Sequence, residues 1–96
     1  MTTQIMEARE GHTTQQMEQV ARDEGLPAEA IRKGVAQGEI VIPCNPARAD
    51  QRVVGIGKGL RTKVNASIGT SSDICDVSAE VKKARAAQEE GADTLM

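Results

Sequence analysis

The sequence lacks aromatic residues altogether: its 96 residues include no Phe, Trp or Tyr. Aromatic side chains supply the largest buried areas in most cores, so a core here must be built from Ala, Val and Ile. The eighteen Val, Ile and Leu residues are a small apolar inventory for this length. The composition therefore favours a piece of a larger protein over a free-standing domain. It also excludes an aromatic platform for stacking nucleic-acid bases.

Long apolar runs and strong charge are missing as well. No run approaches the roughly 18 apolar residues that a membrane-spanning helix needs. The N-terminal "MTTQIMEARE" lacks the basic segment and hydrophobic core of a secretory signal. The net charge is only −2, so no basic surface for nucleic acid is indicated. We expect a cytoplasmic protein that binds neither nucleic acid nor membrane.

Cysteine and histidine are scarce. Cys44 and Cys75 are too few and too far apart for a zinc knuckle or a CxxC redox pair, and we expect buried or idle thiols. His12 stands beside a glycine and two threonines, which favours a surface histidine over a metal ligand. No metal site is therefore predicted in this chain.

The first half of the chain has a helical pattern that ends in a short strand. Thr13 and Gln16 fit a capping box, and the helix that follows should end at Gly25. Pro27 suits the first position of a second helix. The β-branched "EIVI" at 39–42 predicts a strand that the next proline halts. Two short helices and a strand would form a small cap.

The second half begins with "RVVGIG" at 52–57, which predicts a strand that pairs with 39–42. Alternating apolar and polar residues predict another strand over 62–69. A helix should follow from Val77 to Glu90, with Asp76 or Ser78 as its N-cap and with Val77, Val81 and Ala84 along one side. After Gly91, "ADTLM" begins a new strand. Strand, helix and strand in this order predict a parallel βαβ unit.

These elements predict an α/β fold with a small helical N-terminal cap over residues 1–51 and a short strand pair. Residues 52–96 would then form the first βαβ unit of a TIM-like barrel, which is incomplete on its own. The pattern alone fits a doubly wound sheet equally well. Two parallel strands and one crossover helix cannot bury one another, which again indicates a part of a larger protein.

The stretch "VGIGKGLRTKVNASIGTSS" at 54–72 carries four glycines and three basic residues. It is neither a P-loop nor a dinucleotide fingerprint, because it leads into a strand rather than a helix. Two interpretations remain: a tight turn with a solvated basic patch, or a surface where Lys58, Arg61 and Lys63 face an anionic substrate or partner. Asn65 and Ser67 lie on one side of the predicted strand, either satisfying local backbone or facing a ligand.

Two segments, "GIGKGLRTKVNASIGTSSD" and "EVKKARAAQEEGADTLM", closely resemble the ThiC family, the phosphomethylpyrimidine synthases of thiamine biosynthesis. The earlier "REGHTTQQMEQVARDEGLPAEAIRKGVAQGEIVIP" is similar to the family's N-terminal region. Family members continue past "ADTLM", so the resemblance implies an N-terminal segment. It also implies a TIM-like barrel, between an N-terminal cap and a C-terminal region.

The resemblance implies a radical S-adenosylmethionine enzyme that rearranges aminoimidazole ribotide into the pyrimidine phosphate of thiamine, a carbon–carbon lyase type of reaction. Its 4Fe-4S cluster is held by a cysteine triplet, and a zinc or similar divalent metal by histidines; both ligand sets are expected beyond this chain. We therefore expect the 96 residues alone to be inactive. The expected partners are the ribotide, the rest of the synthase chain and a second copy in a homodimer.

The resemblance also implies substrate-binding residues. The family commonly reads Asn-Ala-Asn-Ile-Gly, and its second Asn, which contacts the ribotide, matches Ser67. Met96 matches a Met that lines the same site, and Asn65 matches the first Asn, whose implied role is structural or supporting. A paralogous branch makes 5-hydroxybenzimidazole, the lower ligand of some cobamides, from the same ribotide, and Ser67 leaves both products open. A stand-alone interaction domain without catalytic function is the alternative of another class.

Overall fold

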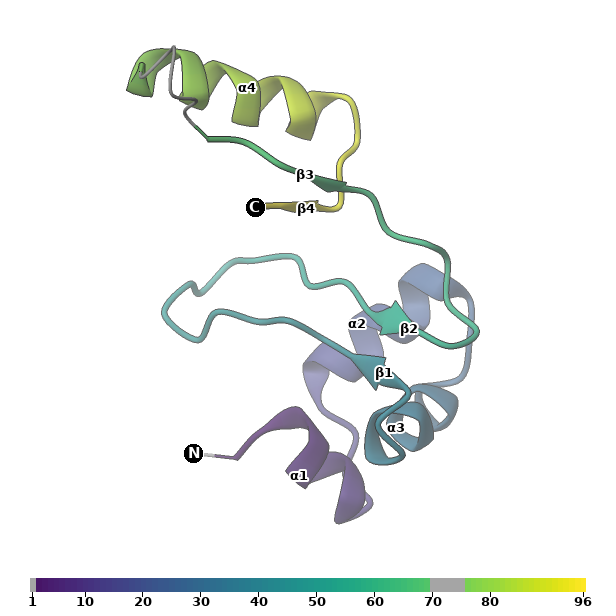
Figure 1. Ribbon diagram of the computed structural model, residues 1–96. Helices are drawn as coiled ribbons and strands as arrows, with labels where there is room; N and C mark the ends of the chain where they lie inside the picture. The colour runs from purple at the N-terminus through teal and green to yellow at the C-terminus, as the bar shows by residue number, and fades with distance from the viewer. Residues whose placement is uncertain (1, 70–75) are drawn as a thin grey trace. The chain divides into compact units, whose positions relative to one another are not determined.

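The computed structural model describes residues 2–69 and 76–96. The described chain divides into two compact units, one that runs to Thr62 and one that begins at Lys63. Figure 1 shows the first unit as helices with a short strand pair, and the second as two short strands with a helix between them. The predicted domain boundary between 51 and 52 stays a prediction.

The first unit opens with three helices: α1 at Gln4–Arg9, α2 at Gln15–Glu24 and α3 at Ala28–Ala36. α2 and α3 were predicted from the sequence, whereas the short α1 was not. The predicted cap of α2 was one residue early, because the hydroxyl of Thr14, not Thr13, accepts the amide of Met17 at 3.2 Å. Gly25 ends α2 in the left-handed conformation with φ of 69°, as predicted. Pro27 is the N-cap of α3.

Two short strands complete the first unit: β1 at Ile40–Val41 and β2 at Ile56–Gly57. They pair antiparallel, with Ile40 opposite Gly57, which confirms the predicted pairing. Gly57 has a φ of 151°, and a Cβ at this position would lie 2.1 Å from the carbonyl oxygen of Glu39. The strand pair therefore requires glycine at 57.

The core of the first unit is small and aliphatic. Met17, Val20 and Ile31 are its largest fully buried side chains. Together with them, its buried hydrophobic residues are Ala8, Ala21, Val35, Ile40, Ile42 and Val53. Side chains from the three helices thus close over the strand pair and the segment around Val53. The spacing of Met17, Val20 and Ala21 indicates one apolar side of α2, and that of Ile31 and Val35 one apolar side of α3; these residues are the ones that are buried.

The second unit consists of β3 at Asn65–Ala66, α4 at Val77–Glu89 and β4 at Thr94–Leu95. β3 and β4 pair parallel, with Asn65 opposite Thr94, as the predicted βαβ unit requires. The Asp76 carboxylate caps α4 by accepting the amides of Ser78 and Ala79. Whether this unit begins a TIM-like barrel stays a prediction.

The predicted apolar side of α4 is exposed. Val77 is 77% and Val81 48% exposed, and none of the residues of α4 is buried. Ala84 is half-buried. This side of α4 is not buried within the chain, because two-residue strands offer too little apolar surface to cover a helix of 13 residues.

Candidate functional site

Ser67 and Met96 lie opposite each other at the carboxyl ends of the two parallel strands. The Met96 amide donates to the Ala66 carbonyl at 2.9 Å, and the Ile68 amide donates to the Met96 carbonyl at 2.7 Å. These two bonds extend the ladder past β3 and β4, and they flank Ser67 on both sides. The backbone of Ser67 is therefore held against Met96.

The side chains of this strand pair divide between two faces. The Thr94 hydroxyl donates to the Asn65 amide oxygen at 2.7 Å, so these two side chains share a face. Since successive side chains alternate along a strand, Ser67 and Met96 belong to the same face. Asn65, Ser67 and Met96 are exposed, whereas Ala66 and Ile68 of the other face are half-buried. We call the face of Asn65, Ser67, Thr94 and Met96 the ligand face.

The ligand face has the chemistry of a binding surface. Ser67 offers a hydroxyl that can donate and accept, and Asn65 offers an amide. Met96, 73% exposed, adds a flexible and polarisable thioether that adapts to an apolar or aromatic ring. Neither a carboxylate nor an imidazole belongs to this face. It can hold and orient a small polar molecule, but it supplies no general acid or base. The substrate roles of Ser67, Met96 and Asn65 stay predictions.

A carboxylate from α4 fastens the chain just beyond Ser67. The Gly69 amide donates to Glu80 Oε2 at 2.6 Å, and Lys83 Nζ lies 2.9 Å from Glu80 Oε1. The hydrogen bond from Lys83, and then that from Gly69, hold the pKa of Glu80 below its ordinary value against the opposing effect of burial. Sequence reasoning missed Glu80. Its only signal was an acid–base pair at i,i+3 on a helix.

The amino end of the strand pair is held by Asp93. The Val64 amide donates to Asp93 Oδ2 at 2.8 Å, and the Asp93 amide donates to the Val64 carbonyl at 2.9 Å. This reciprocal pair sets the register in which Asn65 meets Thr94. Carboxylates thus bond the backbone at both ends of the ligand face, Asp93 at the amino end and Glu80 at the carboxyl end.

Two of the three basic residues of the glycine-rich stretch, Lys58 and Arg61, have a carboxylate nearby. Lys58 Nζ lies 3.8 Å from a Glu39 carboxylate oxygen, and the Arg61 amide donates to both carboxylate oxygens of Glu24 at 3.0 and 3.2 Å. These nearby carboxylates offset the local positive charge. The geometry favours the interpretation as a tight turn with a solvated basic patch.

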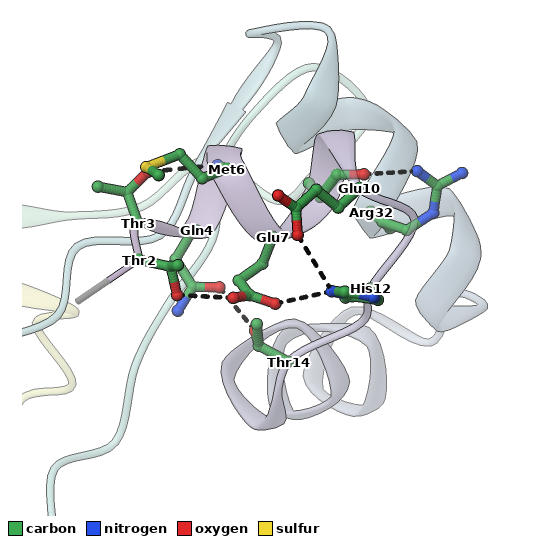
Figure 2. A network of polar contacts seen from close by, with 10 residues as sticks. Thr2, Thr3, Gln4, Met6, Glu7, Glu10, His12, Thr14 and Arg32 are labelled. Atoms are coloured by element: carbon green, nitrogen blue, oxygen red, sulfur yellow. Dashed lines mark hydrogen bonds and ion pairs between the residues drawn. The ribbon is translucent and has the colours of Figure 1, made fainter.

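A second polar cluster surrounds Glu7 in α1 (Figure 2). The Thr2 hydroxyl donates to Glu7 Oε1 at 2.6 Å, and His12 Nδ1 lies 3.0 Å from Glu7 Oε2 and 3.7 Å from Glu10 Oε2. The bond from Thr2, and then the contact with His12, hold the pKa of Glu7 below its ordinary value. The His12 side chain is 60% exposed, as predicted for a surface histidine. The cluster ties the two ends of α1 together.

The first unit also contains an open cavity of about 620 Å³. Apolar side chains such as Ile5, Val35, Ile40 and Ile42 dominate its wall, with Gln4 and Gln16 among the polar ones. Cys44 is its one titratable lining residue. The cavity could hold an apolar group, but it brings no acid–base pair to bear on it.

Within the described residues, Cys44 has no second cysteine nearby with which it could hold an iron–sulfur cluster. Cys44 is exposed rather than buried, and its sulfur accepts a hydrogen bond from Gln51 Nε2 at 3.4 Å. Cys75 lies outside the described residues. Within 2–69 and 76–96, no three His, Cys, Asp or Glu side chains are grouped closely enough to hold a metal ion. In the same ranges, no helix is long and apolar enough to cross a membrane.

Comparison with known proteins decides the family. The profile of the Radical SAM ThiC family matches residues 3–96. The chain belongs to this family. Over all 96 residues it is 68% identical to a 5-hydroxybenzimidazole synthase of Desulforapulum autotrophicum and 65% identical to one of Geobacter sulfurreducens. Over 94 residues it is 60% identical to phosphomethylpyrimidine synthase 1 of Methanosarcina barkeri. The chain spans 22% of the length of each of these relatives.

Proposed function

We propose that this chain is the N-terminal segment of a ThiC-family radical S-adenosylmethionine enzyme that converts aminoimidazole ribotide into 5-hydroxybenzimidazole. The observation that carries the choice of product is the identity of 68% and 65% to two 5-hydroxybenzimidazole synthases. The family resemblance by itself implied the pyrimidine phosphate, with 5-hydroxybenzimidazole as the alternative. Relatives named for the pyrimidine product are 60% and 59% identical, so that product becomes the second candidate.

The contribution of this segment is to bind the substrate. In a parallel barrel, ligands bind at the carboxyl ends of the strands, which is where Ser67 and Met96 lie opposite each other. The Ser67 hydroxyl would hydrogen-bond a polar atom of the ribotide. Met96 would pack against its ring. Asn65, bonded to Thr94, would keep the two strands in register beside them.

Position 67 is Ser where the family resemblance implies Asn, and this change is compatible with the proposed product. A serine hydroxyl has a shorter reach than an asparagine amide, and it has one donor hydrogen instead of two. A ribotide held by Ser67 would therefore sit closer to β3, or keep a water in between. Such a shift alters which substrate atoms face the reactive part of the site. A different product from the same substrate is a reasonable consequence.

The iron–sulfur cluster and any zinc would be held by parts of the enzyme outside this chain, since the described residues group no three side chains that could hold a metal ion. We also propose that the complete enzyme is a homodimer and that the second unit is part of its TIM-like barrel. In the complete enzyme, the exposed Val77 and Val81 would be covered by neighbouring elements. This segment would then contribute one wall of the substrate site.

The test is product analysis with the full-length protein. The enzyme is prepared anaerobically and incubated with aminoimidazole ribotide, S-adenosylmethionine and a reductant. Mass spectrometry should find 5-hydroxybenzimidazole. The pyrimidine phosphate as the sole product would overturn the choice of product. An enzyme whose cluster is active but that does not consume the ribotide would show that the proposed substrate is wrong as well.

A further inference from the structure

Glu80 is a well-covered carboxylate to which the proposed function gives no role. It lies in the first turn of α4, and its side chain is only 14% exposed. Covering a carboxylate is costly unless its oxygens are hydrogen-bonded. Here each oxygen has its own partner: Oε2 accepts the Gly69 amide at 2.6 Å, and Oε1 accepts Lys83 Nζ at 2.9 Å. The carboxylate is therefore fixed in one orientation.

The partner of Glu80 is backbone that directly follows the ligand face. Gly69 is two residues after Ser67, and its φ of 152° lies in a region that side chains rarely adopt. The backbone bonds to β4 reach as far as Ile68. The bond from Gly69 to Glu80 is the next backbone contact that the described residues show, and it holds the backbone just beyond Ser67.

We propose that Glu80 is a positioning residue for substrate binding: it holds the Gly69 backbone so that the Ser67 hydroxyl stays within reach of the ribotide. This inference rests on the proposed function. A carboxylate suits the task because a hydrogen bond from an amide to a charged oxygen is shorter and stronger than one to a neutral acceptor. Lys83 orients the carboxylate but does not touch the strand.

Two substitutions at position 80 separate the effect of side-chain length from the effect of charge. Glu80→Asp keeps the charge but withdraws the carboxylate by one methylene group, which breaks the bond to Gly69. Glu80→Gln loses the charge but keeps an oxygen at the same reach. Lys83→Ala is the matched control, since it removes the other partner of Glu80 and leaves the Gly69 bond available. All variants are made in the full-length enzyme, and their thermal unfolding is compared with that of the parent.

The readout is steady-state kinetics with aminoimidazole ribotide. Glu80→Asp should raise the KM about three- to tenfold, the effect of one hydrogen bond, with a smaller change in kcat. Glu80→Gln should raise the KM less than Glu80→Asp does, because it keeps an acceptor at the same reach but loses the charge that strengthens the bond. Lys83→Ala should stay within about twofold of the parent. Because Glu80 acts through Ser67, adding Glu80→Asp to Ser67→Ala should raise the KM little further.

Two results would overturn the inference while leaving the proposed function intact. In the first, Ser67→Ala raises the KM and Glu80→Asp adds its own full effect to it. In the second, Glu80→Asp lowers the unfolding temperature and kcat but leaves the KM unchanged, which is a purely structural role. If Ser67→Ala has no effect on the KM, the ribotide contact of the proposed function is wrong, and the inference falls with it.

Discussion

Met96 holds Ser67 from both sides: its amide donates to the carbonyl before Ser67, and its carbonyl accepts from the amide after it. The two residues come from strands that α4 separates in the sequence. Alternation places both side chains on the face where Thr94 bonds Asn65. Two substrate-binding residues implied by family resemblance are thus brought together by backbone geometry alone.

The first prediction concerns Ser67. Ser67→Ala in the full-length enzyme should weaken ribotide binding severalfold, because one hydrogen bond contributes roughly 0.5 to 1.5 kcal/mol. Ser67→Asn should bind the ribotide and shift the product toward the pyrimidine phosphate. Calorimetric binding and product analysis measure the two effects. Ser78→Ala, at an exposed position of α4, is the control. Parent-like binding by Ser67→Ala would contradict the assigned contact.

The second prediction is that the 96-residue chain has no synthase activity by itself. The described residues include no group of side chains that could hold a metal ion, and the ligand face carries no acid or base. The assay combines the purified chain with aminoimidazole ribotide, S-adenosylmethionine and a reductant under anaerobic conditions. Turnover that persists after a companion polypeptide is ruled out by mass spectrometry would contradict the prediction.

The third prediction tests the cap of α2. Thr14→Ala should lower the free energy of unfolding of the first unit by about 0.5 to 2 kcal/mol, because the Met17 amide loses its acceptor. The Thr14 hydroxyl also donates to the Gln4 side chain at 2.6 Å, so the loss should fall in the upper part of that range. Thr13→Ala is the neighbouring control and should be almost neutral. Equal losses from both substitutions would show that the cap is misassigned.

The fourth prediction compares the two units. Amide hydrogens of α4 should exchange with solvent much faster than those of α2 and α3, because α4 has no buried residue while α2 and α3 supply most of the core. Hydrogen exchange followed by NMR on the isolated chain measures this directly. Comparable protection in all three helices would mean that α4 is covered, for example by a second copy.

The fifth prediction concerns pH. The pKa of Glu80 is lowered in the folded chain, so its bonds contribute stability above the ordinary value of 4.5 and lose it as the pH falls through the lower folded value. The NMR shift of the Gly69 amide should therefore titrate with a midpoint below 4.5. In Glu80→Gln this titration should vanish. A midpoint at or above 4.5 in the parent would contradict the cause assigned to the shift.

The local spacing of apolar residues was enough to predict α2 and α3, the helices that bury an apolar side. Met17 and Val20 in α2 and Ile31 in α3 are buried as their spacing indicates. The six-residue α1 was missed because distant contacts hold it: Arg32 Nη1 donates to the Ala8 carbonyl at 2.7 Å, and Arg9 Nε donates to the Ala36 carbonyl at 3.2 Å. Thr13 and Thr14 are adjacent, and only the backbone geometry shows that Thr14 is the one that caps α2.

The candidate site was predictable only in part. Alternation put Asn65 and Ser67 on one side of a strand, but their approach to Met96 depends on a crossover of 13 helical residues. The hydrogen bond from the Gly69 amide to Glu80 links two positions that no short motif connects. Val77 and Val81 show a second limit of prediction from the sequence. Their spacing indicates an apolar side of α4, but not what covers it.

The most direct test of the account is a crystal structure of the full-length enzyme with aminoimidazole ribotide bound. We predict that the Ser67 hydroxyl lies within direct or one-water hydrogen-bond reach of the ribotide, with the Met96 side chain against the ligand on the same face. A ribotide bound elsewhere, or a Ser67 side chain that faces the outer helices of the barrel, would contradict the account.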